Sequence, residues 1–132
     1  MTGAVFYATR FGASEGVAKY IAGRIGADIV DLQKTPDADP EGYGKVVLGC
    51  GVYNGQVLPL IRDFAKRYAD AAPDFDFFLV CALRDEKADE QLERIAKELG
   101  VGRRVYFNAP RNMMGVEGSK LELFIEHLSN KN

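Results

Sequence analysis

Hydroxyl and glycine residues follow the first apolar stretch of the chain at a spacing that suits the binding of an anion. Residues 4–7 (AVFY) are apolar, and Thr9, Gly12 and Ser14 come directly after them, before residues with helical spacing. A loop that leads from a strand into a helix presents backbone N–H groups at the positive end of the helix dipole. We expect the two hydroxyls and the intervening N–H groups to converge on one anion, for which phosphate is the natural candidate.

This loop also has a purely structural interpretation. Ser14 is a good N-cap for the helix that follows, and Gly12 suits an ordinary turn, so neither residue by itself requires a ligand. The hydroxyl at the strand end, a further glycine at position 16 and the charge of Arg10 favour anion binding. The residues assigned to this first ligand loop are Thr9, Arg10, Phe11, Gly12, Ala13 and Ser14.

A second glycine-rich segment follows the third apolar stretch, residues 46–50. Tyr53 can offer its ring to another flat π-system, which prefers an offset contact. Asn54-Gly55 is the dipeptide most tolerant of positive φ, so its peptide bond can turn over at little cost. Taken alone, an ordinary turn is the plainer interpretation of this dipeptide. The residues assigned to this second loop are Gly51, Val52, Tyr53, Asn54 and Gly55.

A third candidate loop, Leu83, Arg84 and Asp85, follows the fourth apolar stretch. Asp85 is interpreted first as the N-cap of the next helix, because aspartate accepts hydrogen bonds from the first free N–H groups of a helix. Arg84 either faces a ligand crevice and holds negative charge or is a solvated surface residue, and the sequence does not separate the two.

The elements that must position these loops alternate along the chain. Strands are predicted at residues 5–8, 29–32, 46–50, 75–83 and 105–107, and helices at residues 17–25, 59–68, 85–99 and 121–128. Apolar strands that alternate with helices predict an α/β fold with a parallel sheet covered on both faces. Right-handed crossovers favour one domain over residues 1–132 with strand order 2-1-3-4-5, a three-layer sandwich whose ligand crevice opens at strands one and three.

Composition narrows the functional classes. The 132 residues are 47% apolar and 27% charged with a net charge of −2, and no basic run provides a nucleic-acid or anionic-membrane surface. No apolar stretch reaches the roughly 18 residues of a membrane span, and no secretion signal is evident. Cys50 and Cys81 lie in apolar strands and are interpreted as buried free thiols of a cytoplasmic protein, although a disulfide stays open. No residue is singled out as a catalytic group or a metal ligand.

The loop motifs resemble those of a known family. The strand followed by residues 9–14 (TRFGAS) resembles the FMN-phosphate loop of flavodoxins, and residues 49–53 are similar to the flavodoxin loop whose aromatic residue covers one face of the isoalloxazine ring. Thr-Arg-x-Gly in particular is similar to the flavodoxin-type menaquinone-dependent protoporphyrinogen oxidase branch. The resemblance implies noncovalently bound FMN, with its phosphate in residues 9–14 and its ring between residues 51–55 and 83–85.

The function that this resemblance implies is electron transfer between redox partners, one of them a protein. The alternative is a flavin-dependent oxidoreductase that acts on a quinone or tetrapyrrole, with Arg10, Arg84 and Arg111 as partners for substrate carboxylates. Two departures bear on the choice: residues 83–85 lack the second aromatic of many flavodoxins, and residues 108–118 are short for a tetrapyrrole platform. A phosphoacceptor receiver domain is disfavoured because strand three ends in Gly-Cys-Gly instead of an aspartate, and a flavin-free domain stays open.

Overall fold

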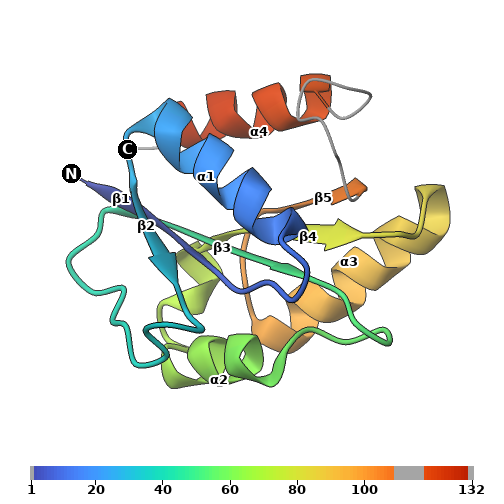
Figure 1. Cartoon of the computed structure of the whole chain (residues 1–132), viewed down its shortest axis with the longest axis horizontal. Helices are drawn as coiled ribbons and strands as arrows, with labels where there is room; N and C mark the ends of the chain where they lie inside the picture. The colour runs from blue at the N-terminus through green and yellow to red at the C-terminus, as the bar shows by residue number, and fades with distance from the viewer. Residues whose placement is uncertain (1, 109–117, 131–132) are drawn as a thin grey trace.

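The computed structural model describes residues 2–108 and 118–130, and strands and helices alternate in it except between the second and third strands, which a loop joins (Figure 1). The elements are β1 (Gly3–Tyr7), α1 (Ala13–Ile25), β2 (Asp28–Asp31), β3 (Lys45–Gly51), α2 (Pro59–Arg67), the 3₁₀ turn η1 (Ala72–Asp74), β4 (Asp76–Cys81), α3 (Asp85–Leu99), β5 (Arg104–Asn108) and α4 (Gly118–Ser129). Pro59 stands at the first turn of α2, where its missing N–H removes no helical hydrogen bond.

The five strands form one parallel sheet in the order β2-β1-β3-β4-β5. In the register of the central strands, Val5 is the partner of Val47 and Gly49 is the partner of Phe78. The α/β fold and the strand order predicted from the sequence are therefore confirmed. Because every strand runs the same way, the carboxyl ends of all five meet at one edge of the sheet.

Helices cover both faces of the sheet (Figure 1). Successive strand residues point to opposite faces, so Phe6 packs in a core with α2 and α3, whereas Val5 and Tyr7 pack in a core with α1 and α4. The strand residues are buried in β1 and β4, as expected for a sheet covered on both sides. Burial of these apolar side chains supplies most of the stabilisation of the fold.

Gly49 lies at a close approach between neighbouring strands. A Cβ atom at this position would lie 1.9 Å from Cζ of Phe78, so the phenylalanine ring occupies the space that any other residue's side chain would need. Phe78 is fully buried, and its ring packs against that of Phe107 with centroids 6.3 Å apart. The missing side chain of Gly49 is thus a packing requirement of β3.

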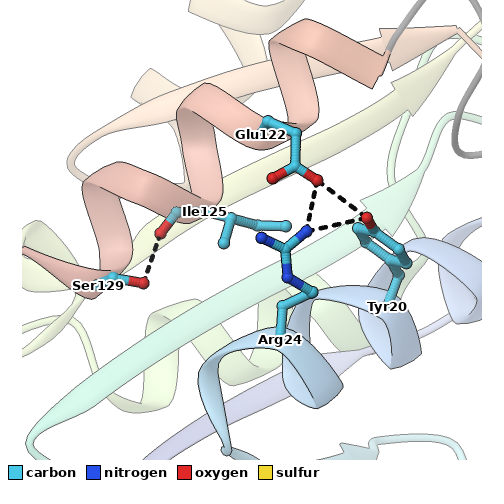
Figure 2. A network of polar contacts seen from close by, with 5 residues as sticks. All are labelled: Tyr20, Arg24, Glu122, Ile125 and Ser129. Atoms are coloured by element: carbon cyan, nitrogen blue, oxygen red, sulfur yellow. Dashed lines mark hydrogen bonds and ion pairs between the residues drawn. The ribbon is translucent and has the colours of Figure 1, made fainter.

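Polar side chains connect α1 with α4 at the surface of one helical layer (Figure 2). Tyr20 donates a hydrogen bond to Glu122 at 2.9 Å, and the Arg24 guanidinium donates to both the tyrosine hydroxyl and the Glu122 carboxylate. The hydrogen bond from Arg24 is the main reason that the pKa of Glu122 lies below its usual value. Solvent screens this cluster, so its net contribution to stability is small. Its main effect is to orient α4 relative to α1.

All five predicted strands differ from the structure by one or two residues at each end, and the second and fourth show the physical reasons. The second is one residue earlier than expected and half-exposed, because β2 lies at the sheet edge and Ile29 remains 41% exposed. The fourth is shorter: the N–H of Phe75 binds Ala72 in η1, and Leu83 lies beyond the last sheet residue. No helix in the described ranges is long and apolar enough to cross a bilayer.

The cysteines Cys50 and Cys81 are both buried free thiols, as expected. Burial raises the pKa of the Cys50 thiol. The thiolate is the reactive form, so this cysteine is a packing residue at neutral pH.

Candidate functional site

Three loops start side by side at the carboxyl edge of the sheet. β1, β3 and β4 are successive neighbours, and the segments that follow them are residues 8–12, 52–58 and 82–84. These are called the first, second and third loops below. This edge is where open parallel sheets bind ligands, and the first two loops lie at the strand pair from which the chain winds in opposite directions.

The backbone of the first loop is held by side chains. Thr9 accepts a hydrogen bond from the N–H of Gly12 at its Oγ1 atom, 2.9 Å away, so its hydroxyl closes the loop on itself. The N–H of Thr9 donates to the side-chain oxygen of Gln33, also at 2.9 Å. Gly12 has a φ of +96°, a backbone conformation that favours glycine, and it turns the chain into α1.

Ser14 lies inside α1, one residue after the helix starts. The N-cap position is occupied by Gly12, so the interpretation of Ser14 as the N-cap is wrong. Its side chain is buried, at 1% exposure, and its Oγ atom has no hydrogen-bond partner among the described residues. A buried hydroxyl without a partner costs free energy, and in a folded protein it calls for an explanation. Ser14 is therefore a polar group available to a ligand at the N-terminus of a 13-residue helix.

Tyr53 of the second loop reaches across to the first loop. Its hydroxyl accepts a hydrogen bond from the N–H of Arg10 at 2.8 Å. The Arg10 guanidinium lies 5.1 Å from the centroid of the tyrosine ring, and the ring of Phe11 lies 6.0 Å from it at an angle of 66°. Phe11 itself is 84% exposed. The two sequence segments predicted to share a ligand are thus in direct contact.

A tight turn forms the tip of the second loop. Tyr53 and Gln56 exchange two backbone hydrogen bonds, at 2.8 and 3.1 Å, around Asn54 and Gly55. Both central residues have positive φ, 54° and 77°, which is the pattern of a type I′ turn. Asn54 and Gly55 thus adopt the positive φ values that the sequence predicts they tolerate. Arg94 of α3 donates a hydrogen bond to the carbonyl oxygen of Gly55 at 2.6 Å.

The third loop is tied to the neighbouring strand β5. Asn108 donates hydrogen bonds from its side-chain amide to the carbonyl oxygens of Leu83, at 2.6 Å, and Cys81, at 3.2 Å. Leu83 is 39% exposed, so an apolar group faces outward here. The helix begins at Asp85 and Arg84 occupies the N-cap position without a side-chain cap, so the expectation that Asp85 is the N-cap is wrong. Asp85 has a φ of 55°, an uncommon backbone conformation for a residue other than glycine.

A buried phenol lies under the first loop. Tyr7, the last residue of β1, is 4% exposed and donates a hydrogen bond to Glu15 of α1 at 3.1 Å. Burial and this carboxylate raise the pKa of Tyr7 to about 12, so its hydroxyl keeps its proton. Lys19 forms an ion pair with Glu15 at 3.3 Å and holds the pKa of that carboxyl below its usual value.

The remaining predicted positions divide between the site and the core. Ala13 opens α1, and Gly51 ends β3 beside Tyr53 and Ser14. Val52 is half-buried, and its side chain packs against the core that lies under α2 and α3. The carboxylate-binding role considered for Arg111 concerns a residue outside the described ranges.

Three residues that support the loops were not predicted from the sequence: Gln33, Arg94 and Asn108. Gln33 follows the end of edge strand β2, which lies next to β1, and Asn108 ends edge strand β5, which lies next to β4. Their positions beside these strand ends were the signal in the sequence that could have identified them. Arg94 lies on an exposed helical face, where nothing in the local pattern separates it from a solvated arginine.

The site's donors and surfaces fit a phosphate joined to a flat ring. The buried Ser14 hydroxyl and the N–H groups at the start of α1 are donors of the kind that bind anions, and the missing side chain of Gly51 lets the Tyr53 hydroxyl lie beside them. Tyr53 and Leu83 offer an aromatic and an aliphatic surface on the second and third loops. Two surface cavities of about 490 and 400 Å³ lie instead beside β2 and around residues 39–46, and neither is lined by these residues.

Comparison with known proteins identifies the family to which this fold belongs. The family model of the flavodoxin domain matches residues 4–117. The chain belongs to the flavodoxin domain family, a family of flavin-binding redox proteins. No curated protein matches the sequence.

Solved structures share the fold at low sequence identity. A WrbA-like flavodoxin from Agrobacterium tumefaciens is similar with a TM-score of 0.68 and 13% identity over 98% of this chain and 96% of its own. A flavodoxin from the domain Archaea has a TM-score of 0.66 and 13% identity over 99% and 98% of the two chains. Rubredoxin oxygen:oxidoreductase from Desulfovibrio gigas has a TM-score of 0.69 and 14% identity, and the present chain spans 35% of its length.

Proposed function

We propose that the chain binds FMN noncovalently and passes electrons between redox partners. The observation that carries the proposal is the Ser14 hydroxyl, buried and without a partner at the start of α1, next to Gly51 and Tyr53. Membership of the flavodoxin domain family supports the choice of a flavin. The flavin supplies the redox chemistry, and the protein binds, orients and shields it.

The phosphate of FMN is assigned to the first loop and the start of α1. The hydroxyl of Ser14 donates to a phosphate oxygen, and the free N–H groups of the first helical turn add further donors. The positive end of the helix dipole and the charge of Arg10 stabilise the dianion. Thr9 keeps the loop closed through its bond to the N–H of Gly12.

The ring is assigned to the space between the second and third loops. Tyr53 and Leu83 provide its two apolar surfaces, and the Asn54-Gly55 peptide lies at the tip of the second loop. Asp85 and Glu86 begin α3 and are exposed, so they place negative charge at this edge and disfavour additional negative charge on the flavin. The same acidic helix face can steer a positively charged partner protein towards the site.

A flavin spectrum and calorimetry test the cofactor assignment. The purified chain should be yellow, and the flavin-depleted chain should bind FMN more tightly than riboflavin, since riboflavin lacks the phosphate. Colourless protein that takes up no FMN in calorimetry would overturn the proposal.

Substitution of Ser14 by alanine sharpens the test. We expect Ser14→Ala to weaken FMN binding about 10- to 150-fold, because a hydrogen bond to a charged group contributes roughly 1.5–3 kcal/mol. The flavin-depleted variant should be as stable as the parent or more stable, because the alanine removes a buried unpaired hydroxyl. Ser129→Ala, which removes a hydroxyl bonded within α4 to Ile125, is the matched control and should leave FMN affinity unchanged.

Electron-acceptor assays separate the shuttle from a substrate-specific enzyme. Photoreduced protein should reduce a basic one-electron protein acceptor such as cytochrome c, and the rate should fall as salt screens the acidic face of α3. Rapid turnover of a quinone or of protoporphyrinogen, with slow transfer to the protein acceptor, would favour the oxidoreductase alternative instead.

A further inference from the structure

We propose that the hydroxyl of Tyr53 occupies the phosphate-binding loop as a reversible competitor of phosphate, and that phosphate binding displaces it from the N–H of Arg10. This inference rests on the proposed function, because it assigns the first loop to a phosphate group. It gives Tyr53 a role besides the covering of the ring: a positioning residue that responds to occupation of the loop.

The position of the tyrosine hydroxyl is the first observation. Its oxygen lies 2.8 Å from the backbone nitrogen of Arg10 and accepts that N–H. This N–H belongs to the loop that leads into α1, and it is one of the groups that a phosphate in this loop would use. The phenol and the phosphate therefore need the same donor.

Gly51 makes the position possible. A Cβ atom at residue 51 would lie 2.9 Å from the Tyr53 hydroxyl oxygen and 3.4 Å from the Ser14 Oγ atom. The two hydroxyls thus approach the same small volume, left free by the glycine. Any other residue at position 51 would push the tyrosine oxygen away from the first loop.

The tyrosine is held at the loop by contacts that can be exchanged. The Arg10 guanidinium lies 5.1 Å from the centroid of its ring, and the centroid of the Phe11 ring lies 6.0 Å from it. Both residues are exposed. The positive-φ residues Asn54 and Gly55 follow directly and give the loop an adjustable turn. The tyrosine side chain can therefore leave the loop without disturbing the buried core.

The relative strengths of the Tyr53 phenol and phosphate as hydrogen-bond acceptors decide which of them binds the N–H of Arg10. A phenol oxygen is a neutral acceptor of one N–H, whereas a phosphate dianion makes several charge-assisted hydrogen bonds, each roughly twice as strong. Phosphate therefore replaces the phenol, and its net affinity is lower by the strength of the bond that it breaks. The ribityl end of riboflavin, which has no phosphate, leaves the bond between Tyr53 and Arg10 in place.

The test compares the flavin-depleted full-length chain with Tyr53→Phe, which keeps the ring and removes the hydroxyl. Isothermal titration with inorganic phosphate, FMN and riboflavin gives three affinities for each protein. We expect Tyr53→Phe to bind phosphate and FMN about three- to tenfold more tightly, as the removal of a neutral competing hydrogen bond predicts, with riboflavin changed less than about twofold. The matched control Tyr43→Phe removes a phenol bonded to Asp28 at the other end of the sheet, and all three affinities should stay the same.

Amide hydrogen exchange gives a readout independent of ligand affinity. Without phosphate, the N–H of Arg10 should exchange faster in Tyr53→Phe than in the parent chain, and saturating phosphate should make the two rates equal. Weaker phosphate binding by Tyr53→Phe would overturn the competition and make the hydroxyl a phosphate ligand. Unchanged phosphate affinity, or no phosphate binding by either protein, would also overturn it.

The two proposals fail in different ways. If the parent chain binds phosphate but not FMN, the flavin assignment fails while the competition is still measured with phosphate alone. If the parent chain binds FMN and Tyr53→Phe leaves FMN and phosphate affinities unaltered, the competition fails while the proposed function stands.

Discussion

The guanidinium of Arg94 donates a hydrogen bond of 2.6 Å to the carbonyl oxygen of Gly55, and so joins the middle of α3 to the tip of the second loop. The two residues are 39 positions apart in the sequence. It restrains the turn that holds Asn54 and Gly55 in left-handed conformations, next to the assigned ring site.

Removal of this restraint should affect the cofactor more than the fold. We expect Arg94→Met to reduce FMN affinity about two- to fivefold and to shift the midpoint potential, because the turn loses a charge-assisted hydrogen bond. Thermal stability should change by less than about 1 kcal/mol, since the arginine is exposed. Lys97→Met removes the same charge one turn further along α3 and is the control. Equal potentials for the two variants would show that charge, and not the tether, is responsible.

Gly55 should be sensitive to the backbone that a substitution imposes. Gly55→Val places a β-branched residue at a φ of 77°, which costs about 1–3 kcal/mol and favours a different turn geometry. We expect this variant to bind FMN with a shifted midpoint potential. Gly55→Asn adds a side chain of similar size that tolerates positive φ, and it should stay close to the parent. Spectroelectrochemistry of the three proteins checks this, and an unshifted Gly55→Val would contradict it.

Gly49 should be among the positions least tolerant of a methyl group. A Cβ atom there would lie 1.9 Å from the ring of Phe78, which is fully buried, so Gly49→Ala should lower the free energy of unfolding by at least about 2 kcal/mol. Phe78→Leu in the same chain should recover part of the loss, because it removes the atoms in conflict. Urea unfolding of both single variants and the double variant measures the coupling. Additive losses would mean that the ring is not what excludes the methyl group.

Alkaline pH should destabilise the fold through Tyr7. The pKa of this phenol is about 12 in the folded chain and close to its ordinary value of 10 when unfolded, so above pH 10 the unfolded chain loses the proton first. The stabilisation is fully present below pH 10 and is lost as the pH rises to 12. Tyr7→Phe should remove roughly 1–3 kcal/mol of this pH dependence, measured by urea unfolding between pH 9 and 12. An unchanged slope would exclude Tyr7 as its source.

The architecture was predictable because its signals are local. Residues 46–50 are a short apolar run between polar segments, and Leu121, Phe124, Ile125 and Leu128 recur with helical spacing, so element types follow from periodicity. The chirality of crossovers then leaves few strand orders. Strand ends were less accurate, because the edge strand β2 and the turn before β4 depend on contacts between distant segments.

The closeness of the first two loops was predictable from their positions after adjacent strands, but their side-chain contacts were not. Serine is a common N-cap, so residue type points to Ser14, but the N-cap position is taken by Gly12, two residues earlier. The hydrogen bond between Tyr53 and Arg10 needs the missing side chain of Gly51, and it joins residues that are 43 positions apart in the sequence. Propensities of single residues contain no such information.

The strand order has a consequence for how this scaffold can diverge. The two loops that contact each other follow β1 and β3, adjacent strands of the sheet interior, whereas β2 and β5 form its margins. Apart from Gln33 and Asn108, which hold the first and third loops, the described residues on those margins make none of the hydrogen bonds that join the first and second loops. A lineage can thus change its outer surface, or be fused into a longer polypeptide, while the contact between these two loops is kept.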